Sequence, residues 1–194
     1  MHKRLRKEAV EARRSADPDV VLHADEGNLN EWRAWIRGPE DTPYAAGVFE
    51  LEIRAGGQYP LSPPTVSMVT PIFHPNIHGA SGEICLDILK SEWSPAWTLS
   101  SACTAIRALL SAPNPDSPLN CDAGNLMRSG DVAGFQKKAR EMVDAHASAP
   151  MPDRADLGRL APKAEEAPSA GPRCGAWTAA AAVAFPVIVA LYCL

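Results

Sequence analysis

GVFELEIR, residues 47–54, is the segment on which the expected fold depends most directly. Every second side chain in it is apolar: Phe49, Leu51 and Ile53. Charged residues stand between them, and a period of two is typical of a strand with one buried face. The same alternation precedes it in EWRAWIR (31–37) and follows it in TVSMV (65–69). Three such segments joined by short turns predict an antiparallel meander.

Helical periodicity appears on both sides of these strands. Residues 5–15, rich in Arg and Lys, predict an opening helix. Apolar residues recur at helical spacing in two later segments, the second of them behind Asp131, a candidate N-cap. The apolar positions are Leu99, Ala102, Cys103, Ile106 and Leu110, then Val132, Phe135, Ala139, Met142 and Val143. The order helix, sheet, helices predicts an α+β domain.

Composition divides the chain into three parts. Residues 1–147 mix apolar, charged and turn residues as a globular domain does. Residues 148–173 contain five prolines and no aromatic residue, which predicts a flexible linker. Residues 174–194 carry no charge, and as a helix they would span about 30 Å, the thickness of a bilayer core. We therefore expect a C-terminal tail anchor, with a buried soluble helix as the alternative.

Charge and cysteine content exclude several classes of protein. The 19 basic and 23 acidic residues give no overall attraction to nucleic acid. Five cysteines at irregular spacings, without a CxxC pair, do not form a recognisable disulfide framework. The basic N-terminus lacks the apolar run of a secretory signal, so we expect a reducing compartment and free thiols.

The loop between the last predicted strand and the first of the two later helices contains a cysteine outside any periodic pattern. It reads PIFHPNIHGASGEICLDILKSEWSPAWTL, residues 71–99. Cys85 has three readings from chemistry alone: a buried inert thiol, a metal ligand with His74 and His78, or a nucleophile paired with a histidine. The metal reading is weak because Pro75 keeps the two histidines off a common helical face.

Several motifs in fixed order resemble the ubiquitin-conjugating enzyme family. They are YPLSPP (59–64), HPNI (74–77), GEICLDILK (82–90), WSPAWTL (93–99) and PDSPLN (115–120). The resemblance covers residues 2 to about 145, and SPLNCDAGNL (117–126) is most similar to the peroxisomal branch of the family. It implies the ubiquitin-conjugating fold and a ubiquitin transferase activity.

The resemblance assigns the chemistry to particular residues. Cys85 accepts the C-terminal glycine of ubiquitin from the ubiquitin-activating enzyme, and the thioester then reacts with an amine. Asn76 occupies the position of the residue that stabilises the developing oxyanion, with bracing of the loop as its alternative role. ATP is consumed upstream by the activating enzyme, so no cofactor and no metal is expected on this chain.

The group that deprotonates the incoming lysine is left open. Members of the family commonly carry an acidic residue at the position of Ser117, and a hydroxyl is not a useful base at neutral pH. Asp116 is either recruited as the base or caps the turn, and Asp87 is a weaker candidate with a structural alternative.

Partner binding is expected on the opening helix and two loops. By position the resemblance places contacts to the activating enzyme and a RING-type ligase at Arg4, Lys7, Leu61, Pro95 and Ala96. A solvated helix face and scattered surface hydrophobicity are the alternatives. The implied location is the cytosolic face of an organelle membrane, a peroxisome in preference to the endoplasmic reticulum. A noncatalytic adaptor that binds ubiquitin or a partner through the same fold is the rival function.

Overall fold

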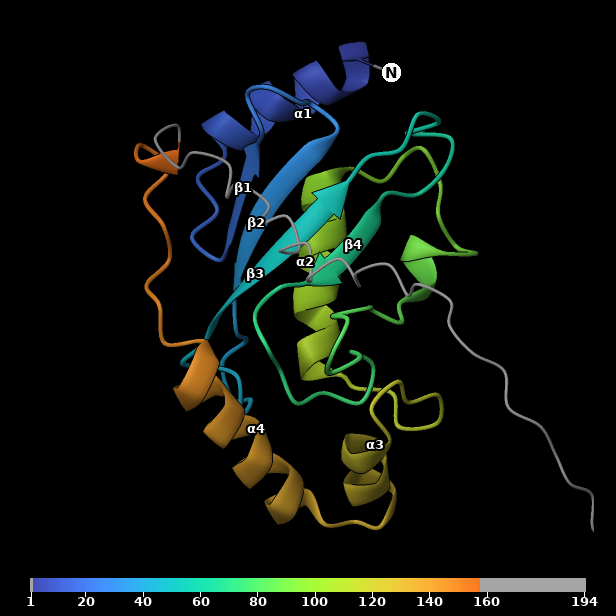
Figure 1. Cartoon of the computed structure of the whole chain (residues 1–194), viewed down its shortest axis with the longest axis vertical. Helices are drawn as coiled ribbons and strands as arrows, with labels where there is room; N and C mark the ends of the chain where they lie inside the picture. The colour runs from blue at the N-terminus through green and yellow to red at the C-terminus, as the bar shows by residue number, and fades with distance from the viewer. Residues whose placement is uncertain (1, 158–194) are drawn as a thin grey trace, which may run out of the picture. The chain divides into compact units, whose positions relative to one another are not determined.

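The alternating segments form a four-stranded antiparallel sheet in the order β1-β2-β3-β4 (Figure 1). Its strands are β1 (Val20–Ala24), β2 (Glu31–Arg37), β3 (Val48–Arg54) and β4 (Thr65–Met68). This computed structural model describes residues 2–157. Within them the expected α+β meander is confirmed, and Trp32, Ala34 and Ile36 lie on the buried face as predicted.

The sequence interpretation missed the first strand. VVLHA does not alternate, because both of its faces are covered. Val20 and Leu22 face the main core, while Val21 packs with Trp35 and Val48 on the opposite face of the sheet. A strand buried on both faces loses the period of two that identifies half-buried strands.

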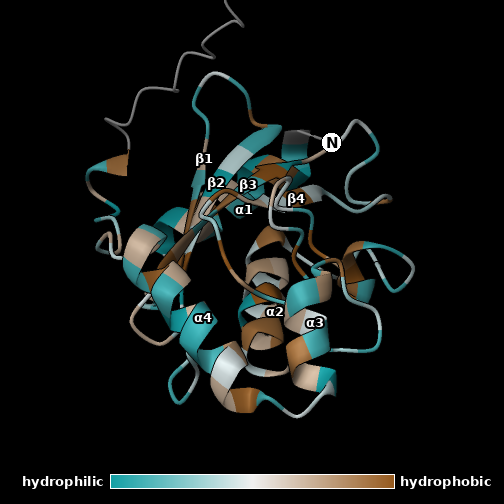
Figure 2. Cartoon of the chain, turned by 60° about the horizontal axis from the view of Figure 1, so that its bottom comes forward, coloured by the Kyte–Doolittle hydropathy of each residue, from teal (hydrophilic) through white to brown (hydrophobic). Residues whose placement is uncertain are grey.

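Helices surround the inner face and the ends of the sheet. They are α1 (His2–Arg14), α2 (Leu99–Ser111), α3 (Cys121–Arg128) and α4 (Val132–His146), with a short 3-10 turn at Asp87–Leu89. The five apolar positions predicted in α2 are all buried. In Figure 2 this helix is coloured largely brown and white, whereas α4 carries teal stretches along its outer side.

The later helices begin at recognisable caps. Thr98 forms a reciprocal capping box with Ser101 at the start of α2. Asp131 accepts from the backbone N–H of Gly134 at 2.8 Å, which confirms it as the N-cap of α4. Phe135, Ala139 and Val143 are buried and Met142 packs partly buried against the core, but Val132 is 55% exposed at the first turn.

The polypeptide after α4 forms a strap, residues 148–157, that packs on the outer face of the sheet. Leu157 is buried against Val21, Trp35 and Val48, and Met151 packs partly buried beside them. The first part of the segment expected to be a linker thus contains apolar side chains that pack on the folded domain. The remainder of the predicted linker and the predicted tail anchor, residues 158–194, lie outside the described residues. Within residues 2–157, no helix is both long and apolar enough to cross a bilayer.

Arg154 ties this strap to the far end of α1. Its guanidinium donates to the backbone carbonyls of Ala12, Ser15, Asp17 and Val20. Carbonyls at the end of a helix have no partner within the helix, so a guanidinium satisfies them and complements the helix dipole.

Candidate active site

A buried histidine holds the His-Pro-Asn turn in place. The Nδ1 atom of His74 accepts from the backbone N–H of Asn76 at 3.1 Å. Nε2 therefore carries the proton and donates to the carbonyl of Leu109 at 3.2 Å. Burial lowers the pKa of His74 to about 4, against a smaller opposing effect of the Leu109 bond, so the ring is neutral at physiological pH.

These bonds argue against the reading of His74 as a metal ligand and as a base for Cys85. With one ring nitrogen accepting and the other donating, His74 has no lone pair left for a metal ion or for the proton of Cys85. His78 accepts at Nδ1 from the backbone N–H of Ser81 at 3.1 Å. The described residues contain no group of three or more His, Cys, Asp or Glu side chains arranged to hold a metal ion.

The side chain of Asn76 joins this turn to the loop before α3. Its Nδ2 donates to the carbonyl of Asn114 at 2.7 Å and to that of Ser117 at 3.4 Å. Its Oδ1 accepts from the backbone N–H of Asn114 at 2.8 Å. The amide is 2% exposed as a residue and is held at both ends.

Cys85 is anchored directly onto the same turn. Its backbone N–H donates to the carbonyl of Asn76 at 2.9 Å, next to an antiparallel bridge between Ile77 and Ile84. The chain reverses between these two segments at Gly82, whose φ of 69° and close approach to the Met68 carbonyl exclude a side chain. Cys85 is half-buried, and so its thiol is neither sealed in the core nor fully solvated.

The other described cysteines differ from Cys85 in exposure. Cys103 is fully buried on α2, and burial raises the pKa of its thiol to about 12. It is therefore inert as a nucleophile at neutral pH. Cys121 is exposed at the start of α3. Only Cys85 among these three shares a hydrogen bond with the His-Pro-Asn turn.

The candidate proton-accepting residues occupy two different loops. Asp116 and Ser117 are exposed on the loop that Asn76 holds, and the Asp116 N–H donates to the Asn114 side chain at 3.0 Å. The backbone N–H groups of Leu119 and Asn120 also donate to the carbonyl of Pro75, which fastens this loop to the turn. The structure thus brings Asn76, Cys85 and the Ser117 loop together through the chain of backbone and amide bonds.

Asp87 sits on the turn immediately after the cysteine. Its side chain is exposed, while its backbone carbonyl accepts from the N–H groups of Lys90 and Glu92, both at 2.9 Å. Its backbone closes the short 3-10 turn, in line with the structural alternative for this residue.

The predicted partner-binding residues fall on segments joined by hydrogen bonds. Leu61 is 79% exposed, and Pro95 and Ala96 are exposed on the loop before α2. The indole N–H of Trp93 joins the two loops by donating to the Pro60 carbonyl at 2.8 Å. This contact and the partial burial of its ring indicate that Trp93 packs between the loops rather than serving as an exposed contact.

The two basic residues predicted to bind partners on α1 differ in exposure and in their contacts within the protein. Lys7 is 75% exposed and lies 3.7 Å from Glu11 in an i,i+4 ion pair. Arg4 is 31% exposed, because its guanidinium donates to the Glu8 carboxylate and to the Trp97 carbonyl. Arg4 is therefore as much an internal brace as a surface contact.

Sequence reasoning missed two residues that organise these loops. Asn114 holds Asn76 through its backbone and Asp116 through its side chain. Glu8 is 4% exposed and lies on the buried stripe of α1 with Leu5, Ala9 and Ala12. Its spacing of three from Leu5 was the available signal, since an acidic residue at a core position needs dedicated partners.

Comparisons with known proteins identify the family of this chain. The chain belongs to the ubiquitin-conjugating enzyme family, whose model matches residues 4–143. It is 58% identical over 139 residues to Protein PEROXIN-4 of Arabidopsis thaliana, covering 71% of this chain and 88% of that protein. It is 55% identical over 141 residues to ubiquitin-conjugating enzyme E2 pex4 of Dictyostelium discoideum, covering 72% and 95%.

A solved structure shows the same fold with a partner present. The ubiquitin-conjugating enzyme Pex4p of H. polymorpha, crystallised in complex with the soluble domain of Pex22p, superposes with a TM-score of 0.73 at 34% identity. The match covers 76% of this chain and 98% of that chain. The predicted family, fold and ubiquitin transferase activity are therefore confirmed.

Proposed function

We propose that Cys85 is the residue that carries ubiquitin. Its thiolate attacks the thioester of the activating enzyme, forms a new thioester with the ubiquitin C-terminus and releases the enzyme's cysteine. A neutral lysine amine then attacks this carbonyl, an amide bond forms, and the Cys85 thiolate leaves. The carrying observation is the position of Cys85: half-buried, bonded to the turn that presents Asn76, and beside the loop of Ser117.

Two features of this site support catalysis without a bound cofactor. Thioester exchange needs no histidine base, because the thiolate is itself a sufficient nucleophile. ATP enters through the activating enzyme, which loads the ubiquitin. Ubiquitin, the activating enzyme and a ligase are accordingly the partners of this chain as a member of its family.

One gel tests the assignment. The full chain is incubated with activating enzyme, ATP and ubiquitin, and the product is separated with and without reductant. We expect a reductant-sensitive adduct that Cys85→Ala removes and that Cys85→Ser converts to a reductant-stable ester. Cys121→Ser is the matched control, since it removes an exposed thiol and leaves the His-Pro-Asn turn intact. A thioester that survives Cys85→Ala contradicts the assignment, and the lack of any adduct on the unmodified chain supports the adaptor rival.

We also propose that the enzyme works at the peroxisomal membrane, held there by residues 174–194. The two relatives named peroxin-4 and pex4 support the organelle, and the uncharged 21-residue stretch supports the anchor. Leu157 packs on the sheet, so at most residues 158–173 separate this contact from the proposed anchor, and a random coil of that length spans about 22 Å. Cys85 would face substrates and ligases of the same membrane at raised local concentration.

Deletion of residues 174–194 tests this anchor. We expect the shortened chain to enter the soluble fraction and to form the Cys85 thioester at the normal rate. Membrane association that resists carbonate in the shortened chain would overturn the anchor. Fractionation with endoplasmic reticulum markers in place of peroxisomal ones would move the enzyme to that organelle.

A further inference from the structure

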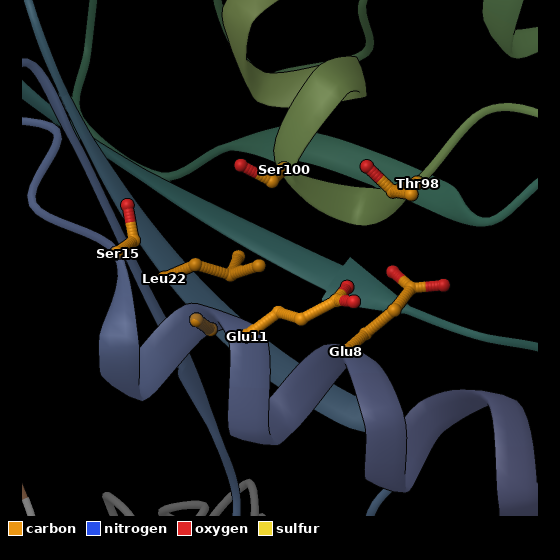
Figure 3. A pocket seen from close by; sticks show the side chains of 7 residues that line it. Glu8, Glu11, Ser15, Leu22, Thr98 and Ser100 are labelled. Carbon is orange, nitrogen blue, oxygen red and sulfur yellow. The ribbon is translucent and has the colours of Figure 1, made fainter.

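Glu8 collects donors from three separate segments of the chain. Its carboxylate accepts from Arg4 Nε at 2.6 Å, from the Tyr59 hydroxyl at 2.7 Å and from the backbone N–H of Leu99 at 2.8 Å. Figure 3 shows the Glu8 side chain reaching from α1 toward the start of α2, where Thr98 lies. With 4% exposure and three donors, this is a buried carboxylate whose acceptor sites are engaged.

Each donor belongs to a segment that carries a predicted partner contact. Arg4 lies on α1 itself, Tyr59 begins the turn that presents Leu61, and Leu99 follows the loop that presents Pro95 and Ala96. Glu8 therefore hydrogen-bonds to all three of these segments through one carboxylate. Glu8 is buried beneath the predicted partner-binding surface and is hydrogen-bonded to each segment that forms it.

Additional bonds extend the same network. The Arg4 Nη2 atom donates to the Trp97 carbonyl at 2.8 Å, next to Ala96. Leu99 is the first residue of α2, so the carboxylate meets the positive end of the helix dipole. The bond to Glu8 also raises the pKa of Arg4 above its ordinary value. Removal of the Glu8 charge would therefore weaken the contacts of α1 with both the Tyr59 turn and the loop before α2.

We propose that Glu8 is a positioning residue for partner binding: it fixes the placement of α1, the 59–62 turn and the 94–98 loop relative to one another. It acts on ubiquitin loading through that surface and has no part in the chemistry at Cys85. This inference rests on the proposed function, because it assumes that the activating enzyme docks on this surface.

The test separates docking from chemistry in the full chain, held in mild detergent. Ubiquitin transfer from a loaded activating enzyme is measured against concentration of the chain, for wild type and Glu8→Gln. We expect the KM for the chain to rise about tenfold, the equivalent of one lost charge-assisted hydrogen bond, with kcat within twofold. Discharge of the preformed thioester to free lysine should be unchanged, because no partner surface is used in that step.

The matched control is Glu11→Gln on the same helix. Glu8 and Glu11 both line a pocket of about 240 Å³, but Glu11 is 55% exposed and pairs with Lys7 at 3.7 Å. An exposed pair of this length contributes little, so its KM should stay within twofold of wild type. Tyr59→Phe removes one donor from Glu8 and keeps the ring; it should raise KM in the same direction by about threefold.

Three outcomes would overturn the inference. If Glu8→Gln lowers the unfolding midpoint but leaves KM unchanged, the residue is structural only. If kcat or lysine discharge falls as far as KM rises, Glu8 acts on the site of Cys85. If Glu8→Gln does not fold, an unchanged KM for Tyr59→Phe contradicts the inference. Failure of the wild type to form any thioester would instead contradict the proposed function and is distinguished on the same gel.

Discussion

The side-chain amide of Asn76 and the backbone of Asn114 form a reciprocal pair, with Nδ2 donating at 2.7 Å and Oδ1 accepting at 2.8 Å. The second Nδ2 hydrogen makes a longer contact of 3.4 Å to the Ser117 carbonyl. A bond of that length is weak, so this hydrogen can be redirected to a developing oxyanion at small cost. A catalytic role for Asn76 would therefore use one Nδ2 hydrogen, while the other Nδ2 hydrogen and Oδ1 hold Asn114.

The first prediction concerns the balance of these two roles. Asn76→Ala should load ubiquitin within about threefold of wild type but discharge to lysine roughly 100-fold more slowly, the loss typical of one oxyanion donor. Single-turnover discharge after removal of ATP measures this directly. Asn114→Ala is the control, because it keeps the backbone pair with Asn76 and removes only the cap on Asp116. If both variants slow discharge equally, bracing of the loop accounts for the whole effect.

Ser117 offers a gain-of-function test. It is exposed on the loop held by Asn76, at the position where the family resemblance implies an acidic residue. We expect Ser117→Asp to speed discharge to free lysine about tenfold or more at neutral pH, toward the range of a positioned general base. Asp116→Asn, measured beside it, should have no effect on the rate. The opposite pattern, with Ser117→Asp silent and Asp116→Asn slow, would assign the base to Asp116.

The pKa of His74, lowered by burial to about 4, predicts a pH-dependent stability. The unfolded histidine titrates near 6.5, so between pH 6.5 and 4 the unfolded state binds the extra proton. The contribution of neutral His74 to the free energy of unfolding is present in full above about pH 6.5. It is lost as the pH falls through this window, by up to about 1.4 kcal/mol per pH unit. Urea unfolding of wild type and His74→Gln at pH 7.5 and 5 measures it. The variant should lose less free energy of unfolding between the two pH values, and equal losses would refute the assignment.

The sequence predicted those parts of the fold in which periodicity and burial coincide. The strands around Phe49 and the helix beginning at Leu99 have one buried face, so their patterns are visible in the residues alone. The strand at Val20 was missed because both faces are covered, and α3 because it is short and follows a Pro-rich loop.

For the candidate site, motif order pointed to Cys85 and Asn76, but not to the contacts that hold them in place. The pairing of Asn76 with Asn114 joins residues 38 apart, and Glu8 meets Leu99 across 91 positions. Contacts over such separations leave no periodic trace in a single sequence. The same is true of Arg154, which reaches back 142 residues to Ala12, and this is why a Pro-rich strap was interpreted as linker.

The strap itself carries the last prediction. Leu157 is 2% exposed against Val21, Trp35 and Val48, and full burial of a leucine contributes about 1.5–3 kcal/mol. A charge there would be placed in an apolar site, so Leu157→Asp should release the strap instead of distorting the sheet. Release frees Arg154, whose guanidinium is otherwise held by backbone carbonyls, and exposes a trypsin site.

Limited proteolysis follows this release. Where opening is fast relative to cleavage, the rate after Arg154 reports the population of the open strap, and each 1.4 kcal/mol corresponds to about tenfold. We expect Leu157→Asp to be cleaved after Arg154 about tenfold or more faster than wild type. Ala155→Ser, at an exposed neighbouring position, should be cleaved at the wild-type rate. Equal cleavage of wild type and Leu157→Asp would mean that the strap is already open in solution, and the tether to the proposed anchor would then begin at residue 148.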